Sequence, residues 1–241
     1  MKILILVAHP DDETIICGGT IDKLVRKEHQ VFVTFLTNND QAYFGSEKQY
    51  ARIRRTKSEG KASSKQLNFS ANFLDFVDMD LNKDKGKLIR ACMDEIRRVK
   101  PDAIITHHSN DKHIDHRTLG EIVPEANFQS GCKLCGGKTQ WSASLILQGE
   151  VDLEMTTPFE PQVISILSEN NVKQKEMAFN CYKSVKDEHK ASQNWLNTKL
   201  RICLSLRGST VGEKYGEAYL VSFYSPLSFR GTSILTTLLE K

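Results

Sequence analysis

Apolar and polar stretches alternate along most of this chain, and the pattern predicts a succession of strands and helices. Short apolar runs with polar flanks predict strands over 2–7, 31–36, 71–77, 103–106, 144–148 and 218–224. Apolar spacing or composition predicts helices over 14–28, 47–66, 84–99, 171–183 and 190–206. Residues 128–142 are expected to form a loop, and the tail after Pro226 is weakly patterned. This alternation is typical of βαβ units and a mainly parallel sheet.

Polar residues follow four of these predicted strands directly. They are His9, Asn38, Asp78 and the segment that begins at His107. Right-handed crossovers place the loops after parallel strands at one edge of the sheet, where open α/β sheets bind their ligands. We therefore expect these four segments to lie near one another.

The first of these loops contains a His and three acidic residues within the five positions from His9 to Glu13. Charged side chains are rarely buried without partners, so this cluster is better explained by a metal and a reaction than by packing. Pro10 keeps His9 extended. The adjacent Asp11 and Asp12 point in different directions, so one can bind a cation while the other faces a substrate. The alternative is that Asp12 only caps the following helix.

The segment 107–116 contains four of the seven His residues of the chain. Neutral imidazole is a common zinc ligand, and two His with one carboxylate leave a tetrahedral zinc an open position for water. His9, Asp12 and one His of this segment would make such a set, and Asp115 could orient one of the imidazoles. The alternative is a polar surface loop that is rich in His by chance.

Three motifs carry a resemblance to a known family. Ala8 to Glu13, the Gly18-Gly19-Thr20 segment and His113-Ile114-Asp115-His116 resemble the PIG-L/LmbE family of zinc-dependent N-acetylglucosaminyl deacetylases. The resemblance implies a Rossmann-like α/β fold, with a mainly parallel sheet flanked by helices and a smaller C-terminal part that shapes the pocket. Residues 1–241 would then form a single domain, with a core over about 1–125 and the C-terminal part over about 126–241.

The family's functional residues can be carried over by position. The resemblance implies zinc ligands at His9, Asp12 and His116, a general base at Asp11, an electrophile or general acid at His113, a residue that positions this His at Asp115, and substrate contacts at Arg55 and Asp78. It implies one zinc ion per chain, and another divalent transition metal stays open.

The resulting hypothesis is a hydrolase that removes the N-acetyl group from an N-acetylglucosamine-type sugar or its conjugate. Zinc lowers the pKa of a water molecule from about 15.7 to about 7. Asp11 would take a proton from this water, and His113 would stabilise the negative charge that develops on the acetamide oxygen. Either residue could protonate the leaving amine.

Two functions from other classes compete with this hypothesis. One is a member of the same fold that has lost catalysis and binds a sugar or a protein partner. The other is a nucleotide-binding dehydrogenase, but the first loop lacks the G-x-G-x-x-G pattern and its aspartates would repel a pyrophosphate.

Composition limits the partners of the chain. Hydrophobic residues make up 39% and charged residues 26%, so a sizeable core is expected, and a net charge of +3 is too small to indicate nucleic acid. No apolar run approaches the roughly 18 residues of a transmembrane segment. The N-terminus has no cleavage site and is interpreted as the first strand of a mature cytoplasmic protein. The expected partner is a small amino-sugar conjugate, and both a monomer and a homo-oligomer stay open.

The six Cys do not suggest a disulfide framework. Cys132 and Cys135 form a CxxC that is similar to half of a zinc knuckle, but a structural zinc site needs four ligands and no second CxxC is present. We expect an ordinary loop here, with a second metal or a redox role as alternatives.

Overall fold

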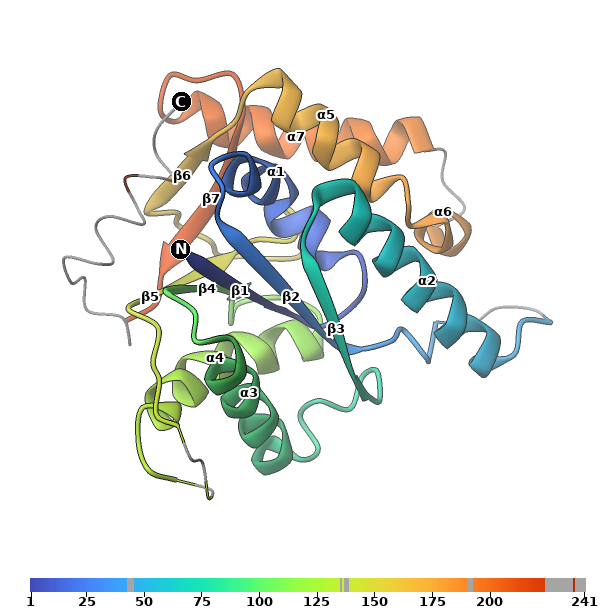
Figure 1. Ribbon diagram of the computed structural model, residues 1–241. Helices are drawn as coiled ribbons and strands as arrows, with labels where there is room; N and C mark the ends of the chain where they lie inside the picture. Colours follow the sequence, from blue (N-terminus) through green and yellow to red (C-terminus); the bar gives the residue numbers. More distant parts are fainter. Residues whose placement is uncertain (43–45, 135, 137–138, 190–192, 224–235, 237–241) are drawn as a thin grey trace.

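The chain forms a seven-stranded sheet with helices on both faces (Figure 1). The computed structural model describes residues 1–42, 46–134, 136, 139–189, 193–223 and 236. Its strands are β1 Lys2–Val7, β2 Gln30–Thr37, β3 Ser70–Phe76, β4 Ala103–His107, β5 Leu145–Gly149, β6 Val163–Ile166 and β7 Gly216–Val221. Its helices are α1 Asp12–Arg26, α2 Gln49–Leu67, α3 Lys85–Val99, α4 Ile114–Ser130, α5 Glu169–Phe179, α6 Lys183–His189 and α7 Gln193–Ser209.

The strand order is β3-β2-β1-β4-β5-β7-β6. β1 pairs in parallel with β2 on one side and with β4 on the other, so the direction in which the chain adds strands reverses between β1 and β4. Such a reversal opens a crevice at the carboxyl ends of the strands, which is where doubly wound folds bind ligands. The loops after β1 and β4 therefore start side by side at this crevice.

Alternate residues of β1 face two different cores, because side chains of a strand point to opposite faces of a sheet. Ile3, Ile5 and Val7 pack in one cluster with residues of α1. Leu4 and Leu6 pack in a second cluster with residues of α3 and α4. The sheet is thus buried on both faces, as its continuous apolar strands require. In Figure 1, α3 and α4 cover one face, and α1, α2, α5 and α7 lie on the other.

A buried ion pair ties the C-terminal elements to α1. Lys175 on α5 donates to Glu217 on β7 at 2.6 Å, and both side chains are almost fully buried. The Glu217 carboxylate also accepts the backbone N–H groups of Gly19 and Thr20 at 2.9 and 2.7 Å. A Cβ atom at Gly19 would lie 2.4 Å from Leu167, so the Gly18-Gly19 motif allows this close contact.

The predicted fold class is confirmed, since the structure has a mostly parallel sheet flanked by helices. Three elements differ from the prediction. The sequence pattern revealed neither β6 nor α6 nor α4, and the last residues of α4, 128–130, were expected to be loop. β6 has only four residues, and α4 contains Pro124, which obscures its helical pattern.

Three further predictions concern parts of the chain other than the sheet. Over the part of the chain that the structure describes, no helix is both long and apolar enough to cross a membrane. Cys135 lies outside the described residues, so the ordinary loop expected around Cys132 and Cys135 stays a prediction. The division at about residue 126 into a core and a pocket-shaping part also stays a prediction.

Gly120 on α4 offers a test of how tightly the β4–α4 loop is packed. A Cβ atom there would lie 2.5 Å from the backbone nitrogen of Ser109 and 2.6 Å from the carbonyl carbon of His108. Because backbone cannot move aside as a side chain can, we expect Gly120→Ala to lower the free energy of unfolding by about 1–3 kcal/mol, measured by urea titration.

Gly86 on α3 is the matched control, since a Cβ atom there meets nothing closer than 3.5 Å. Gly86→Ala should raise the free energy of unfolding by up to about 1 kcal/mol through helix propensity alone. Equal effects of the two substitutions would contradict the close packing of α4 against the loop.

Candidate metal centre and catalytic site

The loop after β1 fixes the relative positions of His9 and Asp12. β1 ends at Val7, the chain bends at Ala8 and His9, and α1 begins at Asp12 after a turn at Pro10 and Asp11. The backbone N–H of His9 donates to Oδ2 of Asp12 at 2.8 Å, which orients the carboxylate toward the sheet edge. The same oxygen lies 3.2 Å from Nδ1 of the His9 ring.

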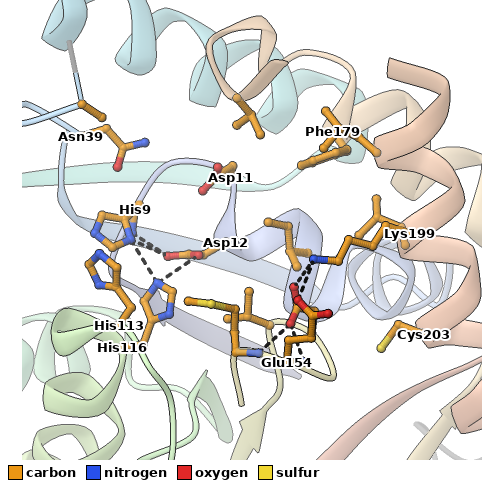
Figure 2. Close-up of a pocket in the computed structure, with 18 of the residues that line it drawn as sticks. His9, Asp11, Asp12, Asn39, His113, His116, Glu154, Phe179, Lys199 and Cys203 are labelled. Carbon is orange, nitrogen blue, oxygen red and sulfur yellow. Dashed lines mark hydrogen bonds and ion pairs between the residues drawn. The ribbon is translucent and has the colours of Figure 1, made fainter. Parts of the chain in front are cut away.

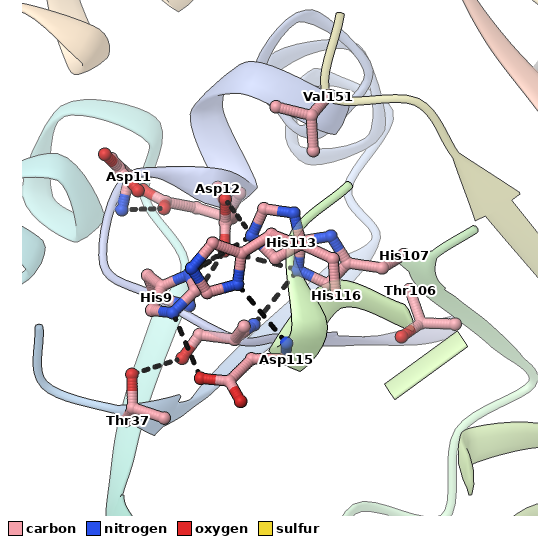
Figure 3. A network of polar contacts seen from close by, with 12 residues as sticks. His9, Asp11, Asp12, Thr37, Thr106, His107, His113, Asp115, His116 and Val151 are labelled. Atoms are coloured by element: carbon pink, nitrogen blue, oxygen red, sulfur yellow. Dashed lines mark hydrogen bonds and ion pairs between the residues drawn. The ribbon is translucent and has the colours of Figure 1, made fainter. Parts of the chain in front are cut away.

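The loop after β4 brings a second set of side chains to the same place. His113 caps the N-terminus of α4, where its Nδ1 accepts the backbone N–H of Asp115 at 3.3 Å. His116 lies on the first turn of this helix. Because β4 is the neighbour of β1, this turn lies next to the His9 loop (Figure 3).

His9, Asp12 and His116 converge on a single point. Nδ1 of His9 lies 3.2 Å from Nε2 of His116, and this nitrogen lies 3.4 Å from Oδ1 of Asp12. The edges of a tetrahedron around a zinc ion are about 3.3 Å long when its ligands lie at about 2.0–2.1 Å. The three side chains are at most 9% exposed. Their donor atoms thus have the chemistry and the spacing to hold a divalent metal ion.

Carboxylates hold the far side of both imidazole rings. Nε2 of His9 lies 3.0 Å from Asp78 and 3.4 Å from Asp115, and Nδ1 of His116 lies 3.0 Å from Asp111. Such carboxylates orient ligating imidazoles and raise their basicity, and almost every His ligand of a metal has a carboxylate, a backbone carbonyl or a water at its other nitrogen. This arrangement is independent support for a metal at the opposite nitrogens.

Two of the residues predicted by resemblance therefore have a more specific place than expected. The carboxylate of Asp115 lies against His9 and accepts the backbone N–H groups of Met79 and Leu81 at 2.7 and 3.2 Å. The backbone N–H of Asp115 donates to Nδ1 of His113. Asp78 lines the cavity, but its Oδ1 contacts His9.

Asp111 is a site residue that the sequence analysis did not identify. Its Oδ1 contacts Nδ1 of His116 and also accepts the backbone N–H of His113 at 2.8 Å. Its Oδ2 accepts the hydroxyl of Thr156 at 2.7 Å, which ties the site to the segment between β5 and β6. The available signal was its place in the His-rich segment, five residues before His116.

His107 is a second residue that received no role from the sequence. Its ring stacks on that of His116 with centroids 4.0 Å apart, and its Nε2 lies 3.2 Å from Asp12 and accepts the backbone N–H of Ala8 at 3.0 Å. Burial, reinforced by the charge of His116, lowers the pKa of His107 to about 4, so this ring is neutral. Asp12, His107 and His116 also lie close enough together to share an ion.

The electrostatics of the centre favour a positive charge. Burial opposes protonation of His9 and His116, but neighbouring carboxylates outweigh it and raise the pKa of both rings. Burial likewise opposes ionisation of Asp12, but the rings of His116 and His107 hold its pKa well below the usual value. Burial and the nearby charges of His9 and His116 lower the pKa of His113. The His113 ring is therefore the neutral group beside this charged centre.

Asp11 is held in a strained conformation at the edge of the centre. Its φ of 128° is rare for a residue with a side chain, and such strain is often found at functional sites. Its backbone N–H donates to Glu13 at 3.2 Å, and its carbonyl accepts the Thr14 hydroxyl at 2.7 Å. Its side chain lines the same cavity as Asp12 and His113 (Figure 2).

Glu13 anchors this strained loop to the rest of the molecule. It is fully buried, and its Oε1 accepts the hydroxyls of Tyr182 and Ser63 at 2.6 and 2.7 Å. Burial raises the pKa of Glu13 to about 7 despite these hydrogen bonds. The two partners come from α2 and from the connection between α5 and α6, so residues far along the chain fix the position of Asp11.

The site opens into a cavity of about 340 Å³. We call the side that contains His9, Asp11, Asp12, His113 and His116 its polar end. In Figure 2, Phe179, Lys199 and Cys203 line the opposite side. The described lining does not include Arg55, whose guanidinium pairs with Glu59 and Asp187 near the surface of α2. The structure thus brings together the predicted metal and catalytic residues but places Arg55 elsewhere.

Comparisons with known proteins identify a matching family and solved structures with a similar fold. A family model described as PIG-L, GlcNAc-PI de-N-acetylase, matches residues 4–127, just over half of the 241 residues. The N,N′-diacetylchitobiose deacetylase from Pyrococcus horikoshii shares 22% identity and a TM-score of 0.80, over 95% of this chain and 87% of that chain.

Two other solved structures show that the fold is not limited to one reaction. The 4-carboxy-2-hydroxymuconate hydratase GalB from Pseudomonas putida KT2440 has 20% identity and a TM-score of 0.79, over 94% of this chain and 97% of that chain. The zinc-inhibited form of the teicoplanin deacetylase Orf2 has 14% identity and a TM-score of 0.72, over 92% and 99% of the two chains. At these identities the likeness shows a shared fold.

The role of Asp111 can be tested by removing its charge alone. Asp111→Asn keeps the size of the side chain but weakens the hold on Nδ1 of His116. We expect the zinc affinity to fall by roughly 10–100-fold, measured by competition with a chromogenic chelator. Asp80→Asn is the control, because Asp80 lies in a nearby loop and pairs with Lys83 instead of a His. An unchanged affinity in Asp111→Asn would remove this residue from the metal centre.

Proposed function

This chain belongs to the PIG-L family, and from that premise we propose that it removes the N-acetyl group from an N-acetylglucosamine-type amino sugar or its conjugate. The products would be acetate and the free amine. The observation that carries the proposal is the convergence of His9, Asp12 and His116 beside Asp11 and His113 at one end of a cavity. We propose zinc as the ion, with another divalent transition metal as the alternative.

His9, Asp12 and His116 would hold the metal, while Asp78, Asp111 and Asp115 keep the two rings in place. A divalent ion bound there lowers the pKa of a water molecule to about 7 and polarises an amide carbonyl. The carboxylates of the site also favour the ion, since they raise the affinity of this buried centre for positive charge.

Asp11 is the residue that we propose as the acceptor of a proton from the attacking water. Its carboxylate lines the cavity next to Asp12, and the contact of its backbone with Glu13 limits the directions it can take. A carboxylate held in this way can act as a general base without reorganisation during the reaction.

His113 lies beside the same centre, with its ring 4.7 Å from that of His9 and 4.6 Å from that of His116. Because Nδ1 of His113 accepts the backbone N–H of Asp115, its Nε2 would carry the hydrogen and would donate it to the oxyanion. Proton delivery to the leaving amine by His113 or by Asp11 stays open.

Acetate release distinguishes this function from two alternatives. A hydratase, suggested by the likeness to GalB, would add water to a carbon–carbon double bond and release no acid. A member of the fold without catalysis would bind the sugar and leave the acetamide intact. Acetate measured after incubation with N-acetylglucosamine glycosides therefore tests the proposal directly.

Metal dependence gives the first prediction for this function. Dialysis against a chelator should remove the ion and reduce acetate release to background, and one equivalent of Zn²⁺ should restore it. Metal content is measured by mass spectrometry in parallel with the rate. A metal-free preparation that keeps its full rate would contradict the proposed mechanism.

The second prediction for this function separates the role of His113, at the N-cap of α4, from that of His116, in the first turn of this helix. His113→Ala should lower kcat by roughly 10²–10³-fold while the protein keeps its metal, because one oxyanion donor is lost. His116→Ala should lose the metal itself. His29→Ala, at the turn before β2 and far from the cavity, serves as the control. Full turnover by His113→Ala would exclude the assigned role.

A further inference from the structure

The side of the cavity opposite the metal centre has an apolar part next to the Lys199–Asp152 ion pair. Ile15, Phe179, Val185, Leu196 and Leu200 line it, and we call them the apolar wall. Phe179, Val185 and Leu196 belong to a small hydrophobic cluster of their own, with Ile15 and Leu200 packed against it. This cluster is separate from the two cores that cover the sheet. One side of it therefore faces the cavity, where a ligand could cover it.

The charged residues of the cavity are nearly all acidic. Among the described residues that line it, the carboxylates are Asp11, Asp12, Asp78, Asp152 and Glu154, and Lys199 is the only Lys or Arg. Lys199 already donates to Asp152 at 2.9 Å. Sites for phosphate or carboxylate groups usually offer several basic side chains, often a bidentate Arg. Away from the metal centre, Lys199 is thus the only Lys or Arg that the described lining offers to an anionic group of the substrate.

The distribution of polar groups suggests how a sugar would lie. Sugar hydroxyls need hydrogen-bond partners when they leave water, and Asn39 lines the cavity beside the metal centre together with Asp11 and Asp78. The acetamide must also lie there to reach Asp11 and His113. The apolar wall is then left for whatever is attached to the sugar.

We propose that the substrate is an N-acetylglucosaminide whose aglycone is a small, uncharged alkyl or aryl group, and that the apolar wall binds this group. The inference rests on the proposed deacetylase function and specifies its substrate class. A volume of about 340 Å³ is at the lower end of the range of ligand pockets, which fits one sugar with a modest substituent.

The test compares four compounds with the zinc-loaded, full-length protein. They are hexyl N-acetylglucosaminide, N-acetylglucosamine, N-acetylglucosamine 1-phosphate and N-hexanoylglucosamine, and the released acid is quantified for each. We expect kcat/KM for the hexyl glycoside to exceed the values for the free sugar and the phosphate at least tenfold, since burial of two methylene groups alone corresponds to roughly tenfold.

Two results would overturn the inference. A rate for the phosphate equal to or above that for the hexyl glycoside would mean that the cavity accepts anions. A preference for N-hexanoylglucosamine over the hexyl glycoside would mean that the apolar wall binds the acyl chain instead of the aglycone.

Variants locate the effect on the wall. Leu200→Gln should raise KM for the hexyl glycoside about tenfold and lower kcat/KM for this compound much more than for N-acetylglucosamine, because a binding contact to the aglycone is lost. Leu206→Gln makes the same change at an exposed position of α7 outside the cavity and should have no effect. Val185→Thr, which keeps the shape of the side chain, provides a second variant. If all three variants have the same KM for the hexyl glycoside as the unmodified protein, the apolar wall is excluded as the surface that binds the aglycone.

Binding measurements separate this inference from the proposed function. Calorimetry with the hexyl glycoside and with N-acetylglucosamine needs no turnover. If no compound releases acid but the hexyl glycoside binds at least tenfold more tightly, the deacetylase function fails and the apolar site stands. If all compounds release acid at similar rates, the function stands and the inference fails.

Discussion

This molecule is organised around one contact, in which a ring nitrogen of His9 lies close to a ring nitrogen of His116 and carboxylates surround both rings. Nδ1 of His9 and Nε2 of His116 lie 3.2 Å apart, and Asp12 contacts both. Burial of several carboxylates costs several kcal/mol per charge unless positive charge is near them. A cation at this point, whether protons or a metal, balances the charges. The chemistry of the site follows from that requirement.

Backbone hydrogen bonds offset part of the free energy that burial of these carboxylates costs. The N–H of His9 donates to Asp12, and those of Met79 and Leu81 donate to Asp115. These donors come from loops after β1 and β3, and the His residues of α4 follow β4. Such loops meet only because parallel strands end at one edge and because the strand order reverses between β1 and β4. The sheet topology is thus the physical reason that the site is assembled.

Local pattern was sufficient to predict the strands that carry the site. β1, β2 and β4 are apolar runs with polar residues directly after them. The expectation that His9 lies near the His-rich segment rested on this pattern together with the handedness of βαβ crossovers. Short or irregular elements escaped it, as with the four residues of β6 and with α4 around Pro124.

Contacts between distant residues account for what the sequence could not provide. Glu13 is part of the first motif, but its partners Ser63 and Tyr182 lie 50 and 169 residues further along. Nothing in the spacing of those residues links them to Asp11. In the same way, the sequence offered only Asp115 to orient a ring, and the fold is what brings Asp111 against His116 and Asp115 against His9.

The two ends of the cavity have different relations to the family. The family model spans residues 4–127 and so includes the whole polar end, whereas Phe179, Val185, Leu196 and Leu200 lie beyond it. The reaction centre therefore comes from the part of the chain that identifies the family, and most of the apolar wall comes from α5, α6 and α7. Deacetylases and a hydratase share this fold, so the fold alone does not determine the substrate. In this chain the helices after β6 supply the surface on which substrate choice would depend, while the loops after β1 and β4 supply the chemistry.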